Sequence, residues 1–115
     1  MYKSKRAKAT AISKKVKDEV WERDKHKCIY CGSYTANPEA HVVSRQRGGL
    51  GVAKNIVTLC RPCHFKFDSG TNHERVTMKN YILSYLYEYY GKFEEKEVIY
   101  IPEWKRGLER LKNGK

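Results

Sequence analysis

The sequence predicts a small α+β domain held together by a metal ion, and three observations lead to this. The chain has 115 residues, which is room for one domain. Only 23 of them are Leu, Ile, Val or Phe, a small supply of apolar side chains for a core. Four cysteines form two C-x-x-C pairs, and segments with strand and helix patterns lie between and after these pairs. A metal ion would add the stability that so small a core lacks.

The N-terminal segment, residues 1–12, is predicted to be a flexible basic arm. It carries four Lys or Arg, no acidic residue and no apolar period. An arm of this kind could lie along a DNA backbone or simply be solvated. A helix is expected next, from Ser13 as its cap to about Asp24, because Val16 and Val20 fall on one face.

Two short strands are expected to form a hairpin. Residues 39–43 favour a strand and follow Pro38, and residues 55–59 are β-branched enough to be the returning strand. The connecting residues 44–51 are basic and rich in glycine. The hairpin therefore lies between the two cysteine pairs.

Helices are expected after the hairpin. The second cysteine pair leads into a short helix, in which Pro62 is tolerated near the start. A longer helix over residues 74–90 has apolar positions at a period of 3.6 and stops at Gly91, while residues 92–115 suggest a short strand and a frayed helix. The tyrosines of the long helix (Tyr81, Tyr85, Tyr89) are expected to pack against the core rather than stack on bases. The expected division is an arm over residues 1–12, a core over 13–73, and a C-terminal helix and tail packed on it over 74–115.

The charge of the chain indicates a polyanionic partner. There are 24 Lys and Arg against 13 Asp and Glu, a net charge of +11, and neutralised phosphates release counterions. DNA is therefore the expected partner, although a merely soluble basic protein has a similar balance. No apolar run approaches the roughly 20 residues of a membrane span, and the first residues do not resemble a signal peptide. We expect a cytoplasmic protein with no membrane partner.

The cysteine spacing predicts a structural zinc site. Cys28-x-x-Cys31 and Cys60-x-x-Cys63 can each turn two sulfurs towards one ion. Four thiolates complete a tetrahedron, so such an ion stabilises the fold and leaves no position for chemistry. Disulfides are the alternative, but the cytoplasm disfavours them.

Three residues between and just after the cysteine pairs suggest a second site. They are His41 on the first strand, Asn55 at the start of the second, and His64 at the start of the following helix. Taken singly, His41 could be a hydrogen-bonded strand residue, Asn55 could serve only the turn, and His64 could lie beside the zinc ion. Their order, flanked by paired cysteines, is more specific than any one of them.

The stretches AHVVSR, GGLG and NIVTLCRPCH, over residues 40–64, resemble the HNH endonuclease family, including the small HNH proteins encoded by phages and prophages. The resemblance implies a β-hairpin followed by a helix with one metal ion between them, the ββα-metal fold. It also implies DNA cleavage in the cytoplasm of a bacterial host. His41 then corresponds to the general base that activates water, Asn55 to the residue that holds the hairpin loop, and His64 to a ligand of a catalytic Mg²⁺, Mn²⁺, Ni²⁺ or Zn²⁺ ion.

The sequence departs from the family pattern at one position. Many members carry Asp or His directly before the general base as a further metal ligand, whereas this chain has Ala40. Asp68 follows His64 by one helical turn and is the expected substitute. Glu39 is the second choice, since it shares a strand face with His41.

The remaining predictions concern DNA contacts and other functions. Arg45 and Arg47, beside the loop glycines, could hold phosphates or be ordinary surface charges. The chief alternative function is a non-catalytic zinc module that binds nucleic acid, favoured by Ala40. A weaker alternative is an interaction protein whose aromatic helix docks a partner such as a phage packaging protein.

Overall fold

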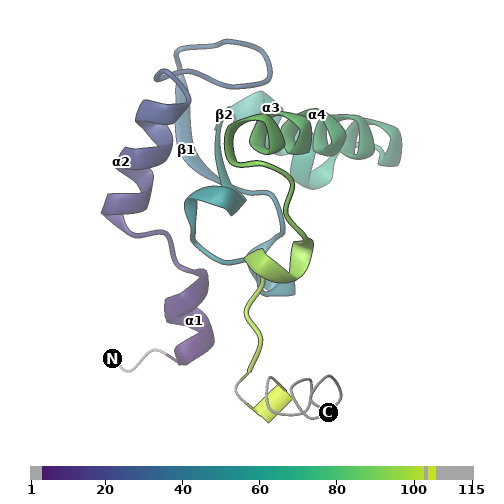
Figure 1. The fold of residues 1–115 in the computed structure, drawn as a ribbon. Coiled ribbons are helices and arrows are strands. Elements are labelled where there is room, and N and C mark those ends of the chain that lie inside the picture. The colour runs from purple at the N-terminus through teal and green to yellow at the C-terminus, as the bar shows by residue number, and fades with distance from the viewer. Residues whose placement is uncertain (1–3, 103, 106–115) are drawn as a thin grey trace.

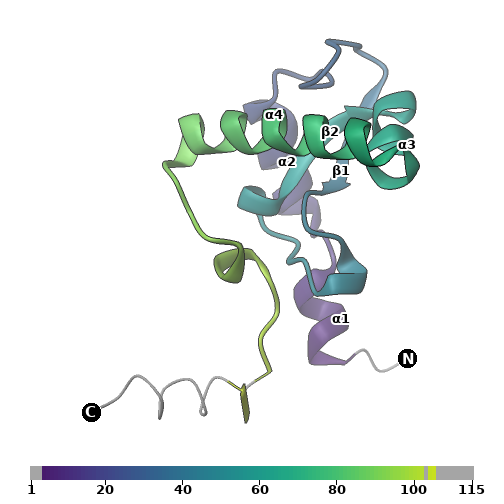
Figure 2. The same ribbon diagram turned by 90° about the vertical axis from the view of Figure 1, so that its right-hand side faces the viewer.

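The computed structural model describes residues 4–102, 104 and 105, and its elements surround a two-stranded sheet (Figure 1). β1 (Ala36–His41) and β2 (Ile56–Cys60) pair antiparallel, so the predicted hairpin is confirmed. Figures 1 and 2 show α2 (Lys14–Arg23) on one side of the hairpin and α4 (Asn72–Tyr90) on the other. α3 (Arg61–Ser69) follows β2 directly. The fold is a small α+β arrangement in which a hairpin is followed by helices.

β1 begins earlier than the sequence predicts and contains an irregularity. Ala36 pairs with Cys60, but Ala40 pairs with Val57, so β1 has one extra residue between Asn37 and Ala40. Pro38 lies in this interval. A β-bulge leaves a residue out of the ladder, and proline has no N–H to give to a ladder. Pro38 is therefore accommodated inside the strand rather than before it.

α2 and α4 each begin directly after a residue whose side chain caps the helix. The Ser13 hydroxyl accepts a hydrogen bond from the N–H of Val16 and caps α2, as expected. Thr71 and Glu74 form a capping box at the start of α4, which places its first residues before the predicted position 74. α4 ends at Gly91, which has φ of 81°.

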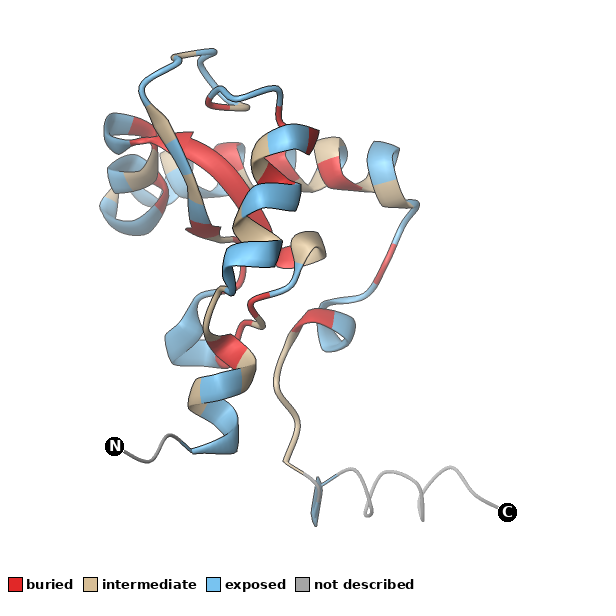
Figure 3. Cartoon of the chain, turned by 90° about the vertical axis from the view of Figure 1, so that its left-hand side faces the viewer, coloured by how far each residue is buried: buried red, intermediate tan, exposed pale blue. Residues whose placement is uncertain are grey.

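The core lies on the α4 side of the hairpin and around β2. All five residues of β2 are buried, because both faces of the strand are covered (Figure 3). On one face, Val57 and Leu59 join a cluster of apolar side chains. α4 contributes residues spaced by four, Met78, Ile82 and Leu86, to that cluster.

A buried ion pair joins the two helices to the sheet. The Arg23 guanidinium contacts the Asp24 carboxylate at 2.7 Å and donates hydrogen bonds to the backbone oxygens of Ala53 and Ile56. Asp24 also accepts hydrogen bonds from the N–H of Thr58 and the hydroxyl of Tyr85. Since the charges are paired and hydrogen-bonded, this burial is tolerated. Tyr85 thus packs against the core as the sequence predicts. Tyr81 and Tyr89, which were also expected to pack there, are exposed.

The N-terminal segment contains a helix that the sequence does not predict. Residues expected to be a flexible arm form α1 (Lys5–Thr10), which is capped by Ser4 and rests on the hairpin loop. Gly51 donates a backbone hydrogen bond to Ala9, and a Cβ at Gly51 would lie 1.9 Å from the oxygen of Ala11. Only glycine permits so close an approach of the two backbones.

The described part of the C-terminal segment also packs on this loop. After η3 (Glu95–Val98), Ile99 forms an isolated antiparallel bridge with Gly49, and Leu50 donates a hydrogen bond to the oxygen of Val98. The short strand and frayed helix were expected within residues 92–115, of which 103 and 106–115 lie outside the described residues. Among the described residues, no helix combines the length and apolarity needed to cross a membrane.

Candidate functional site

The four cysteines come together where the hairpin meets the turn after α2. Their Sγ atoms all lie within 4.8 Å of one another, and those of Cys31 and Cys60 are 3.5 Å apart. Four sulfurs bound tetrahedrally at about 2.3 Å from a zinc ion would be about 3.8 Å apart. Cys28 sits in a tight turn closed by the N–H of Gly32, and Cys63 lies in the first turn of α3. The cluster therefore has the ligands and spacing of a four-cysteine metal site.

Electrostatics within the cluster favour a bound cation. Burial raises the pKa of the Cys28 thiol, but hydrogen bonds from backbone N–H groups, chiefly that of Cys31, outweigh it and lower the pKa to about 7. Burial and the neighbouring sulfurs raise the pKa of Cys63 well above its usual value. One thiolate thus forms readily, whereas four together need a positive charge between them.

His41 lies at the end of β1 and is half-buried under α1. Its Nε2 is 2.9 Å from the backbone oxygen of Thr10, the last residue of α1. A carbonyl can only accept, so Nε2 carries the proton and Nδ1 holds the lone pair of the neutral ring. Burial is the main cause that lowers the pKa of His41, and Arg45 lowers it further. The ring is therefore neutral near pH 7 and able to accept a proton.

Asn55 is fully buried and ties together the two ends of the hairpin loop. Its Oδ1 accepts a hydrogen bond from the N–H of Val43 at 2.8 Å, and its Nδ2 donates to the oxygens of Val43 and Leu50 at 3.1 and 2.9 Å. Gly49 lies against the same residues, since a Cβ there would be 1.7 Å from the Val43 oxygen. The side chain thus fixes the loop that directly follows His41.

His64 and Asp68 form a pair on α3. The His64 Nε2 and the Asp68 Oδ2 are 3.2 Å apart, one helical turn from each other, and both side chains are partly exposed. They line a pocket of about 260 Å³ together with Glu39. Glu39, the alternative ligand, is paired with Lys17 at 3.0 Å. Ala40 is buried in the core and offers no ligand.

Asp68 connects this pair with His41. It also lines a neighbouring pocket of about 480 Å³, whose other residues include His41. Within the described part of the chain, the cysteine cluster is the one place where three or more His, Cys, Asp or Glu donors converge. His64 and Asp68 therefore form a pair of possible metal ligands. His41 lines a neighbouring pocket that Asp68 also lines. Among the described residues, no third His, Cys, Asp or Glu donor converges on this pair.

The two predicted arginines have protein partners. Arg45 directs its guanidinium at α1, with Nε 3.4 Å from the hydroxyl of Thr10 and Nη2 3.5 Å from the oxygen of Ala7. Arg47 pairs with Glu95 at 3.4 Å and lines the His41 pocket. Arg45 thus helps to hold α1 over His41, and Arg47 is the better placed of the two for a ligand in that pocket.

Three contributors to the His41 pocket or its surroundings are not predicted from the sequence. The backbone oxygen of Thr10 gives no sequence signal, because it acts through a contact between residues 31 positions apart. Arg75 and Lys79, on α4, line the His41 pocket. Their spacing of four residues placed them on one helical face, but it could not show that the face borders this pocket.

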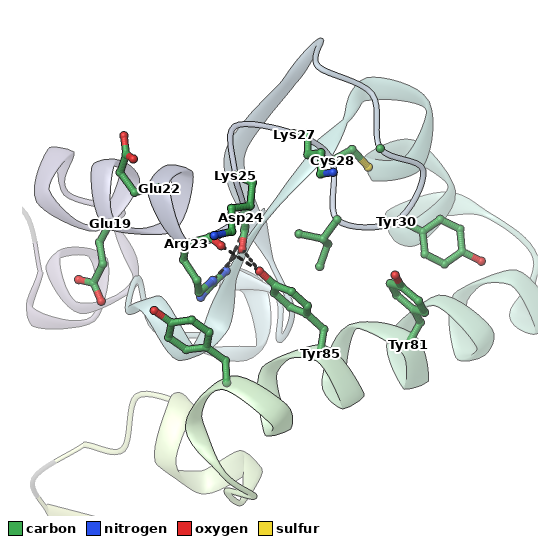
Figure 4. Close-up of a pocket in the computed structure, with 13 residues that line it drawn as sticks. Glu19, Glu22, Arg23, Asp24, Lys25, Lys27, Cys28, Tyr30, Tyr81 and Tyr85 are labelled. Carbon is green, nitrogen blue, oxygen red and sulfur yellow. Dashed lines mark hydrogen bonds and ion pairs between the residues drawn. The ribbon is translucent and has the colours of Figure 1, made fainter.

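A further pocket of about 840 Å³ lies between α2 and α4 (Figure 4). Tyr30 and Tyr81 meet edge to face at its rim, with ring centroids 5.2 Å apart, and Tyr85 points inward to Asp24. The residues of the second predicted site, His41 and His64, do not line it. The tyrosine pocket is therefore separate from the histidine pockets.

Comparisons of the chain with protein-family models, with curated proteins and with solved structures find no match.

Proposed function

We propose that the chain is a metal-dependent endonuclease of the HNH type that hydrolyses phosphodiester bonds in DNA. The observation that carries this proposal is the state of His41: a neutral imidazole, oriented by the Thr10 carbonyl, opens into a pocket shared with Asp68. The net charge of +11 supports a polyanionic substrate.

In this proposal His41 is the general base. Its Nδ1 accepts a proton from a water molecule while the water oxygen attacks the phosphorus atom, and the bond from phosphorus to the 3′ oxygen breaks. The leaving oxygen takes a proton from solvent, so the products are a 5′-phosphate and a 3′-hydroxyl. Asn55 keeps the segment after His41 in place through its bonds to Val43.

The proposal assigns separate metal ions to the two sites. The four cysteines would hold a structural Zn²⁺ ion, which the spacing of their Sγ atoms fits. His64 and Asp68 would hold a catalytic divalent cation with water and phosphate oxygens as its other ligands. That cation would neutralise charge on the phosphate and on the leaving oxygen.

The test is cleavage of supercoiled plasmid by purified protein with Mg²⁺, Mn²⁺, Ni²⁺ or Zn²⁺. We expect His41→Ala to reduce the rate by about 10²–10⁴-fold, because a general base contributes about that much. His73→Ala, a histidine that is exposed on α4, is the matched control and should cleave like wild type. Zinc content and circular dichroism of both variants establish that they fold. Wild-type cleavage rates in His41→Ala would overturn the assignment.

The donor pair has a test of its own. Asp68→Ala should raise the metal concentration that gives half-maximal cleavage, since it removes one of two protein ligands. Unchanged metal dependence would move the assignment to Glu39.

A second function is favoured by the small number of ligands at His64. With a pair of protein donors and Ala40 in place of a third, the module could bind nucleic acid without cutting it. Tight DNA binding by the wild-type protein with no cleavage in any of the four metals would select this function.

A further inference from the structure

We propose that Arg75 and Lys79 of α4 bind phosphates of the DNA strand that enters the His41 pocket. This inference rests on the proposed nuclease function and deepens it, because it states how the substrate strand is held. It places the strand between the end of β1 and the first half of α4.

The geometry of α4 supports this placement. Four residues of its first half line the pocket, and their spacing puts them on one helical face. They are Asn72, Arg75, Val76 and Lys79. His41 and Asp68 line the same pocket from β1 and α3. A DNA strand in this pocket would therefore contact α4 where it reaches the His41 imidazole.

The charges of the pocket suit a polyanion. Of the described residues that line it, three carry a positive side chain and one, Asp68, carries a carboxylate. Arg47 is already paired with Glu95. No hydrogen bond or ion pair joins the side chain of Arg75 or Lys79 to any other described residue, so both cations are available to a ligand.

Helix stability does not account for these two cations. Like charges four residues apart on a helix repel one another and destabilise it slightly. Two other surface lysines do have acidic partners, Lys17 with Glu39 and Lys54 with Glu97. An arginine can bind a phosphate through two parallel hydrogen bonds, and a lysine can add a mobile point charge on a neighbouring phosphate.

The test measures binding of a fluorescent 20-base-pair DNA duplex by anisotropy over a series of salt concentrations, with no divalent cation added. We expect the double variant Arg75→Gln/Lys79→Gln to bind more weakly. The slope of log affinity against log salt should fall by about 0.9 for each lost phosphate contact. The matched control is Lys25→Gln/Lys27→Gln, which removes the same charge from exposed lysines that line the tyrosine pocket instead.

The control separates specific contacts from net charge. A double variant that binds with the wild-type slope, or that loses no more than Lys25→Gln/Lys27→Gln, overturns the inference. So does a wild-type protein that does not bind the duplex. Circular dichroism and zinc content of the double variant show whether its fold is kept. Arg75→Gln alone, at an exposed position, should still lower the slope by about 0.9.

Cleavage kinetics distinguish this inference from the nuclease proposal. If wild type cleaves plasmid, the double variant should have a raised KM with kcat little changed, because flanking contacts bind substrate and transition state alike. An unchanged KM overturns the phosphate contacts and leaves the nuclease intact. Binding that depends on Arg75 and Lys79 without cleavage supports the contacts and overturns the nuclease.

Discussion

Replacing Asn55 with alanine should destabilise the domain by about 4 kcal/mol. The substitution removes the three hydrogen bonds that join Asn55 to Val43 and Leu50 in a fully buried setting. A buried N–H left without a partner costs about 1–3 kcal/mol, and each of the two carbonyl bonds contributes about 1 kcal/mol. The loop after His41 would lose the side-chain hydrogen bonds that join its two ends.

The assay is urea unfolding followed by circular dichroism with Zn²⁺ in excess, so that metal occupancy stays constant. With a urea m-value of about 2 kcal/mol/M, the midpoint should fall by about 2 M. Asn80→Ala, on the exposed face of α4, is the matched control and should change the free energy of unfolding by less than about 0.5 kcal/mol.

A second substitution, Asn55→Asp, tests the same hydrogen bonds through the pH dependence of stability. In Asn55→Asp the side chain still accepts from Val43 but cannot donate to either carbonyl, and it buries a charge. Burial raises the pKa of such a carboxyl in the folded state, so its folding penalty is full above that pKa and shrinks as the pH falls through it. The free energy of unfolding of Asn55→Asp, relative to that of wild type, should therefore rise as the pH falls from 7 to 4. A loss of less than about 1 kcal/mol in Asn55→Ala would refute this reasoning.

Three further predictions concern the metal, the base and α1. Metal analysis should find one zinc ion per chain, and Cys60→Ser should lose both zinc and secondary structure, because metal binding contributes folding energy; an intact fold without metal would contradict this. The lowered pKa of His41 keeps the base neutral further into acid, so the acidic limb of log kcat/KM should lie below pH 6.5; a limb at or above 6.5 would show that the base is a different group. Gly51→Ala should displace α1, since the added Cβ would meet the Ala11 oxygen at 1.9 Å; limited proteolysis by trypsin should then cut within residues 5–8 faster than in wild type, and equal rates would disprove the docking.

The sequence predicted the elements whose signals are local. Ser13 caps α2 as expected, the long helix stops at Gly91, and β2 occurs where β-branched residues gather. β1 is shifted towards the N-terminus and ends at His41, so Val42 and Val43, which suggested the strand, lie beyond it. The cysteine cluster was also predictable, because each C-x-x-C pair is a local turn and the hairpin brings its two ends together. These features depend on a few neighbouring residues and can therefore be predicted from the sequence.

Only the tertiary structure decided what surrounds His41. The segment expected to be a free arm becomes α1 and presents the Thr10 oxygen to the imidazole, and Arg45 directs its guanidinium towards that helix. The pocket also gains Arg75 and Lys79, which lie 34 and 38 residues beyond His41 in the chain. Periodicity tells which face of a helix is polar, but the surface opposite that face is set by the packing of the whole chain. The sequence by itself therefore identified His41 and the four clustered cysteines as candidates, and the fold determined the contacts that orient the His41 ring and the charges that line its pocket.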